Sequence, residues 1–462
     1  MNCKTARWPL SARAALLLAG VAALGGCASY KPLPLPAKAQ LAPGVAALAQ
    51  APAGGGPLGV DQVAALALAN NPELQAARAR HGIAQAQLLQ AGLLPNPSLT
   101  GAFLPLLSGV GTVPAWNVGL SQDIKSLVLY RSRVRAAGDA ARQVDAEIVW
   151  QEWQVAGQAR QLAADLIVGQ ASRQAYEAAW RLLGERNAKA EAALAAGNVS
   201  LVIVAPGRVS LQAARAALDA LDQRLLAQRH QLNALLGLDA DAVVPLADHV
   251  DLPPFDPAAV RALLPSLPDR RPDLLALRMG YEQADEQVRQ AILSQFPDLV
   301  LGGGLASDNS RVINGGPNAA LGLPVFDRKQ GAIGMANATR AQLRADYAAR
   351  LKAAQGQAEA MLGEMEQLAG QLAAVRRDLP AARLAAERAA RAFGASNLDE
   401  RAYIDLLSNR YAKEQEVMTL ELALLDRQIA LQTLVGAGLP TAGLAPGQIV
   451  AGQNATPQGG AK

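Results

Sequence analysis

The sequence predicts a mainly α-helical protein built from two similar halves, each with one β-hairpin and long helices that form a coiled coil. Two segments 200 positions apart, 71–99 and 271–299, share at least ten identical residues without a gap. Residues 115–205 and 325–379 contain no proline, which permits very long helices. Only 4% of the residues are aromatic, and such an alanine-rich, charged composition favours long helices over a thick mixed core.

The first residues predict an export signal. Basic residues precede an apolar stretch near 14–24, which is shorter than the roughly 20 residues that a membrane-spanning helix needs. LGGC at 24–27 resembles the lipobox of bacterial lipoproteins, so we expect residues 1–26 to be a lipoprotein signal peptide and Cys27 to carry a covalent diacylglycerol and an N-acyl lipid. The alternative is an ordinary secretory cleavage site. Cys3 is the other cysteine, so the mature chain is expected to form no internal disulfide.

The chain between its ends repeats one order of parts. Residues 27–59 and 438–462 are rich in Pro, Gly and Ala, which predicts a lipidated N-terminal tether and a flexible tail. Between them we expect a first structural repeat at 60–237, an irregular connector in an equatorial region at 238–270, and a second repeat at 271–437. Each repeat should run from helix to hairpin, long helix, turn and returning helix.

The expected elements follow from Pro and Gly boundaries and from helical periodicity. The first repeat should hold a helix at about 61–93 broken near Asn71-Pro72, strands at about 97–105 and 115–122, and helices at 126–195 and 207–237. The second should hold a helix at 273–295, strands at about 298–306 and 319–325 around a polar loop at 307–318, a long helix, a turn at 394–400 and a helix at 401–436. Pro380 should kink or break the long helix.

The four predicted strands match tilted transmembrane strands in length, about 9–11 residues. They leave two unpaired edges, which cannot face lipid. Because the smallest ordinary barrel has about eight strands, one chain cannot close one. Several copies are therefore expected to pool their strands in a membrane β-barrel.

A family resemblance rests on the lipobox, the duplication, NPEL and RPDL at the start of each repeat, and GLPVFDRKQG at 322–331. Together they resemble the TolC family of outer-membrane efflux channels, in its lipoprotein branch. The resemblance implies a homotrimer with a twelve-stranded barrel in the outer membrane and an α-helical tunnel extending into the periplasm. It also implies a periplasmic adaptor (membrane fusion) protein and an inner-membrane pump of the RND type as partners.

The function implied by the resemblance is a passive exit duct for drugs or metal ions that the pump delivers. One alternative is a lipid-tethered periplasmic coiled-coil adaptor, which would also have long alanine-rich helices. Adaptors, however, typically pair one helical hairpin with a β-rich domain that this sequence lacks. Another alternative is a type I secretion channel of the same fold.

The sequence offers no catalytic constellation, so we expect no enzyme and no cofactor. It lacks GK[ST], HExxH and GxSxG motifs, and the three histidines, His81, His230 and His249, are scattered, which makes a metal site unexpected. Without residues 1–26 the chain has 40 basic and 39 acidic side chains, so no nucleic-acid partner is expected. Gly302–Gly304 is more typical of a strand at a bend than of a phosphate loop.

Three acidic residues form the candidate periplasmic gate: Asp399, Glu400 and Asp405. By the resemblance, Asp405 occupies the place of the family's constriction aspartate. The alternative is that Asp399 is a helix N-cap and Asp405 a solvated surface charge.

The two helical turns are the expected contact sites of the adaptor. Gly197 and Asn198 mark the first turn, Gly394 and Asn397 the second, and the glycines should let the chain reverse. The alternative is helix termination alone. Basic residues also follow both hairpins and are interpreted as a solvated helix face, or as a contact with inner-leaflet phosphates: Lys125, Arg131, Arg133, Arg135, Arg328, Lys329 and Arg340.

Overall fold

The computed structural model describes residues 30–52, 55–252 and 255–437. The chain divides into two compact units, Met1–Leu41 and Ala42–Lys462. In the described part of the first unit, residues 30–41, there is no helix or strand. The predicted signal peptide, Cys27 and the predicted tail lie outside the described residues.

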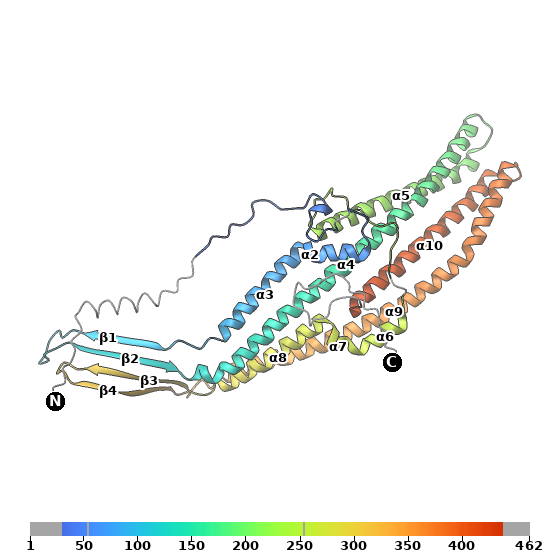
Figure 1. Cartoon of the computed structure of the whole chain (residues 1–462). Coiled ribbons are helices and arrows are strands. Elements are labelled where there is room, and N and C mark those ends of the chain that lie inside the picture. The colour runs from blue at the N-terminus through green and yellow to red at the C-terminus, as the bar shows by residue number, and fades with distance from the viewer. Residues whose placement is uncertain (1–29, 53–54, 253–254, 438–462) are drawn as a thin grey trace, which may run out of the picture. The chain divides into compact units, whose positions relative to one another are not determined.

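In the second unit, one series of elements occurs twice (Figure 1). The first series is α2 (Val60–Asn70), α3 (Pro72–Ala91), β1 (Ser98–Leu104), β2 (Ala115–Asp123), α4 (Lys125–Ala195) and α5 (Leu201–Leu236). The second is α8 (Pro272–Leu293), β3 (Asp298–Ser307), β4 (Ile313–Gly322), α9 (Gln330–Gly394) and α10 (Glu400–Val435). The expected fold class, two repeats each with one hairpin and long helices, is confirmed.

The duplication is visible in matching backbone contacts. Arg78 donates to the carbonyl oxygen of Leu68 at 2.8 Å, and Arg278 donates to that of Pro268 at 2.7 Å. The two returning helices also end alike, because a glycine in the left-handed region follows each of them: Gly237 (φ 72°) after α5 and Gly436 (φ 71°) after α10.

The connector between the repeats is more ordered than the sequence predicts. It forms short helical turns that begin at proline or just before it: α6 (Pro257–Leu263), η2 (Leu264–Ser266) and α7 (Leu267–Arg270). Proline suits the first turn of a helix, where its missing N–H has no intrahelical partner. η1 (Val45–Ala47) and the first part of the connector, residues 238–252, pack on a core formed with α2, α4 and α5. Val260 and Leu267 of the connector pack instead on a core formed with α8, α9 and α10.

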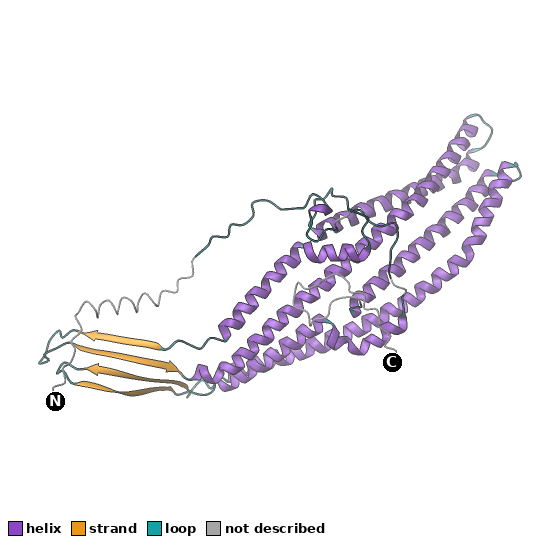
Figure 2. Cartoon of the chain, in the orientation of Figure 1, coloured by secondary structure: helices purple, strands orange, loops and turns teal. Residues whose placement is uncertain are grey.

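The four strands form one antiparallel sheet in the order β1-β2-β3-β4 (Figure 2). The sheet lies at one end of the helices of this unit, and the two helical turns lie at the other end (Figure 1). The predicted extent of β4 is wrong: it begins at Ile313, which pairs with Ser307, so residues 313–318 are strand rather than loop. Pro317 is accommodated because β4 is an edge strand in this chain.

Proline also fails to interrupt two helices. The returning helix of the first repeat starts at Leu201 and contains Pro206. α9 is continuous through Pro380, so the expected break is wrong. The ion pairs Arg376–Glu421 (2.7 Å) and Arg383–Glu414 (2.8 Å) tie α9 to α10 on both sides of this proline.

Among the described residues, α5 is long and apolar enough to cross a membrane by length and composition, which is weak evidence. Its charged side chains pair with α4 instead. Arg173 of α4 lies 2.7 Å from Asp222, and Arg208 pairs with Glu191 of α4. α5 is therefore one arm of a helical hairpin in this structure.

Candidate functional site

The pairing register divides the sheet into two chemically different faces. One face is apolar and carries large side chains from all four strands, many of them exposed: Leu99, Phe103, Trp116, Val118, Leu120, Leu299, Leu301, Leu305, Ile313 and Leu321. A row of exposed apolar side chains on a sheet is typical of contact with lipid or with another protein.

The opposite face carries small and polar side chains, among them Thr100, Asn117, Ser121, Asn314 and Asn318. Glycines complete it: Gly119, Gly302, Gly304 and Gly316. A Cβ atom at Gly302 would lie 2.6 Å from the carbonyl oxygen of Leu120, so glycine is needed for this close strand approach. The expectation that Gly302–Gly304 lies in a strand is confirmed.

The sheet is open at both sides within the described residues. β1 pairs only with β2, and β4 pairs only with β3. Each outer strand therefore presents unpaired backbone N–H and C=O groups, which need a partner wherever water is absent.

The basic residues below the sheet are mostly engaged within the chain. Lys125 donates to the carbonyl oxygen of Ser294 at 2.9 Å and lies 2.6 Å from Asp298. Arg133 donates to the carbonyl oxygens of Ala91 and Leu93 at 3.2 and 3.0 Å. These contacts satisfy the last carbonyls of α8 and α3, so the two side chains fix where helices give way to strands.

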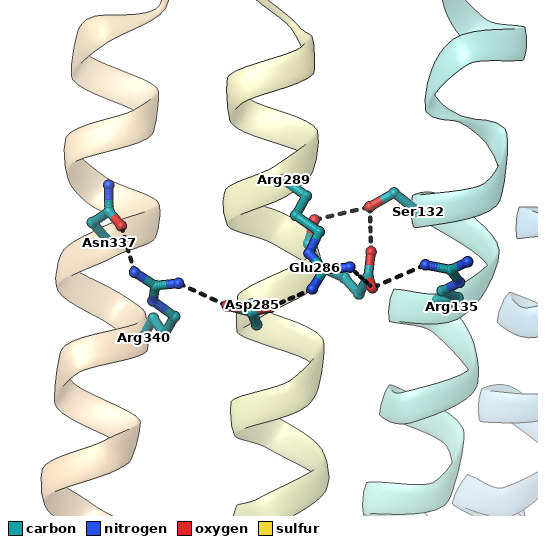
Figure 3. Close-up of polar contacts among 7 residues, drawn as sticks. All are labelled: Ser132, Arg135, Asp285, Glu286, Arg289, Asn337 and Arg340. Atoms are coloured by element: carbon teal, nitrogen blue, oxygen red, sulfur yellow. Dashed lines mark hydrogen bonds and ion pairs between the residues drawn. The ribbon is translucent and has the colours of Figure 1, made fainter.

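Further along the helices, a polar network joins α4, α8 and α9 (Figure 3). The buried Glu286 of α8 lies at its centre, with the Ser132 hydroxyl 2.7 Å from Oε2 and Arg289 donating to Oε1 at 3.1 Å. Next to it, Asp285 accepts from Arg340 of α9 at 2.7 Å. The network connects the first repeat to the second directly below the sheet.

At the far end, the two helical turns have the same backbone geometry. Gly197 (φ 75°) and Ser396 (φ 60°) take the left-handed position. The next residues, Asn198 and Asn397, donate their backbone N–H groups to carbonyls five residues back, at 2.9 and 2.8 Å. From the sequence, Gly394 is expected to reverse the chain. In the structure it is the last residue of α9, and the chain reverses two residues later, at Ser396.

The structure places the acidic residues of this end in different roles. Asp399 caps α10, accepting from the Ala402 N–H at 2.7 Å. Burial raises the pKa of the Glu400 carboxyl, and the charge of Arg186 opposes this effect. Asp405 is exposed and has no hydrogen bond or ion pair with any described residue. The N-cap alternative holds for Asp399, and an exposed, unpaired Asp405 fits both the gate and the surface-charge interpretations.

Sequence reasoning missed the cluster that joins the two hairpins near these turns. Arg186 of α4 lies over the rings of Phe393 and Tyr403, 5.5 and 5.4 Å from their centroids. The rings stack at 5.1 Å. Arg186 is about 200 positions away from the two rings in the sequence, so no local motif could have indicated the contact. No cluster of three or more metal-ligating side chains occurs in 30–52, 55–252 and 255–437.

The comparisons with known proteins agree with this geometry. The sequence model described as outer membrane efflux protein matches residues 263–437.

Solved structures with a similar fold include CusC, whose structures concern the conformational changes that accompany folding and transmembrane channel formation. CusC is 19% identical, with a TM-score of 0.66 over 81% of this chain and 91% of that chain. The outer membrane protein VceC of Vibrio cholerae is also 19% identical, with a TM-score of 0.69 over 82% and 97%. The open outer membrane channel MtrE of Neisseria gonorrhoeae is 18% identical, with a TM-score of 0.65 over 89% and 99%. No curated protein sequence matches significantly. The chain has the fold of these TolC-like channels.

Proposed function

We propose that this chain, a TolC-like protein whose residues 263–437 match the outer membrane efflux protein family, is the outer-membrane channel of a tripartite efflux pump. The sheet carries this proposal, since it has an apolar face, a small polar face and two unpaired edges. Lipid cannot satisfy those edges, so β1 of one copy pairs with β4 of the next. Three copies close a twelve-stranded barrel with the polar face inside.

In this proposal the helices continue the barrel as a periplasmic tunnel, and the turns face an inner-membrane pump and its adaptor. Leu201 and Val202 beside the first turn are 55% and 71% exposed, an apolar surface available to an adaptor. Asp405 from three chains lines the narrow mouth, and a lipid on Cys27 anchors the N-terminus. The channel is a passive duct, because the pump supplies the energy for transport. It is not an enzyme in this proposal.

The first experiment is the detergent-corrected mass, by light scattering, of protein extracted from the outer-membrane fraction. Three chains per particle are expected. A monomer that Cys27→Ala releases without detergent would contradict the proposal and favour the lipid-tethered adaptor. The protein could also be a trimer that serves secretion. If deleting it leaves drug and metal resistance intact but stops export of a protein substrate, the type I secretion channel is favoured.

A further inference from the structure

Two carboxyl groups face each other where α10 packs against the α4–α5 hairpin. Asp165 of α4 and Asp426 of α10 lie close enough for each carboxyl to act electrostatically on the other. The Asp165 side chain is only 9% exposed. The Oδ1 atom of Asp426 is buried and has no hydrogen-bond partner among the described residues. Both residues line a cavity of about 190 Å³ between the three helices.

Two positive charges act on these two carboxyls, and one of them is bonded to the pair. From α5, Arg224 donates to Asp165 at 3.1 Å, and Gln228 also donates to it. Arg427, next to Asp426 on α10, pairs with Glu364 of α9 at 2.8 Å, and its charge acts to lower the pKa of Asp426.

The other titratable side chains of the surrounding helices do not neutralise the pair. Tyr176 of α4 lines the same cavity, and burial raises the pKa of its hydroxyl, so it stays uncharged. The nearest further charges on α4 are paired elsewhere, Arg160 with Asp61 of α2 at 2.9 Å and Arg173 with Asp222 of α5 at 2.7 Å. If both carboxyls ionise, Arg224 is the positive charge bonded to the pair, and Arg427 is already paired with Glu364, so the two negative charges are incompletely balanced in a half-buried site.

The environment raises the pKa values of both carboxyls. Burial raises the pKa of Asp165, and Arg224 partly opposes this. Burial and then the charge of Asp165 raise the pKa of Asp426 to about 7. Because this value lies above that of an unfolded aspartate, the stabilisation is fully present at low pH and is lost as pH rises through about 7.

We propose that Asp165 and Asp426 form a proton-operated latch between the α4–α5 hairpin and α10. A shared proton holds the helices together, and ionisation of both carboxyls loosens them. The consequence for a duct, wider opening at higher pH, rests on the proposed function, whereas the latch itself does not.

Two other side-chain contacts between these helices respond differently to pH. Ser408 donates to Ser210 at 3.2 Å, and this pair carries no charge. Near the turn, Glu400 faces Arg186, so ionisation of Glu400 strengthens that contact. The aspartate pair is therefore the contact that proton loss would weaken.

The test is the separation of the two hairpins in the full-length trimer, measured by pulsed electron paramagnetic resonance between spin labels at Lys189→Cys on α4 and Asn409→Cys on α10. Chains that carry only one of the two introduced cysteines serve as controls, because they show any signal from labels on the native Cys3 and Cys27. From about pH 5 to about pH 9, the distance distribution should broaden and lengthen, with a midpoint near the pKa of the pair.

Asp426→Asn keeps a hydrogen-bond donor but cannot ionise, so its distribution should stay in the low-pH form throughout. Asp165→Asn serves as a second variant with the same expected result. Glu416→Gln, which removes an exposed carboxylate of α10, should follow the parent protein. No pH response in the parent, or the same response in Asp426→Asn, would overturn the latch. Single-channel conductance is recorded separately. If no channels form, the proposed function is rejected, whereas the spin-label distances still test the latch.

Discussion

A Cβ atom at Gly304 would lie 2.8 Å from the carbonyl oxygen of Val118 on the neighbouring strand. Its cross-strand partner, Gly316, has open space at the same position. We expect Gly304→Ala to strain the β2–β3 pairing by about 1–3 kcal/mol, since the obstacle is backbone rather than a flexible side chain. Gly316→Ala should be tolerated. The measurement is the heating temperature at which the purified trimer dissociates in gel electrophoresis, and equal effects of both substitutions would contradict the close approach.

Neighbouring residues of β2 test which face of the sheet meets lipid. Val118 lies on the apolar face and Asn117 on the polar face. Val118→Arg should reduce the amount of protein in the outer membrane, because an arginine facing the bilayer midplane costs about 2–4 kcal/mol. Asn117→Arg should insert normally and lower the single-channel conductance. The reverse pattern in membrane fractionation and bilayer recordings would mean that the faces are assigned the wrong way round.

The long helices, apart from the start of α5, and three of the strands could be predicted because their boundaries are local. Long proline-free runs predict α4 and most of α9, and Pro or Gly marks the ends of β1 and β3. The start of β4 could not be predicted from Gly315-Gly316-Pro317, which is typical of a loop; the register with β3 decides it. Likewise, α9 continues through Pro380 where ion pairs join it to α10, and the local sequence does not reveal those contacts.

The candidate site was predictable only where a motif is local. The N-cap role of Asp399 follows from its place before a helix. The positions of the two turns follow from their Gly and Asn residues, although Ser396 rather than Gly394 takes the left-handed position in the second turn. The stacking of Arg186 on Phe393 and Tyr403, and the pairing of Asp165 with Asp426, join residues from different repeats. Such contacts depend on how the two hairpins pack, which periodicity alone does not determine.

Glu286 provides a test of the network below the sheet. Its side chain is 9% exposed and accepts from Ser132 and Arg289. Glu286→Gln removes the charge that these donors satisfy, so we expect a loss of about 1–3 kcal/mol in unfolding free energy. Glu282→Gln, one turn earlier on the exposed side of α8, is the matched control and should change stability little. Thermal unfolding by circular dichroism measures both, and an unchanged Glu286→Gln protein would show that the network contributes little.

Asp405 tests the proposed periplasmic mouth. It is exposed and unpaired among the described residues, so Asp405→Ala should change stability by less than about 0.5 kcal/mol. If three copies line a constriction, its loss should lower the preference for cations over anions, because a ring of carboxylates concentrates cations in a narrow passage. Reversal potentials in a salt gradient measure this preference, and drug resistance of cells reports pump-dependent efflux.

The matched control is Asp378→Ala, an exposed aspartate on the neighbouring helix α9. Removing it takes away the same charge at a position farther from the turn, so the ion preference should stay near that of the parent protein. If Asp405→Ala leaves both ion preference and resistance unchanged, or if Asp378→Ala alters them equally, Asp405 is a solvated surface charge. In that case the mouth must be narrowed by other side chains near the turns, and the Arg186 cluster is the next place to substitute.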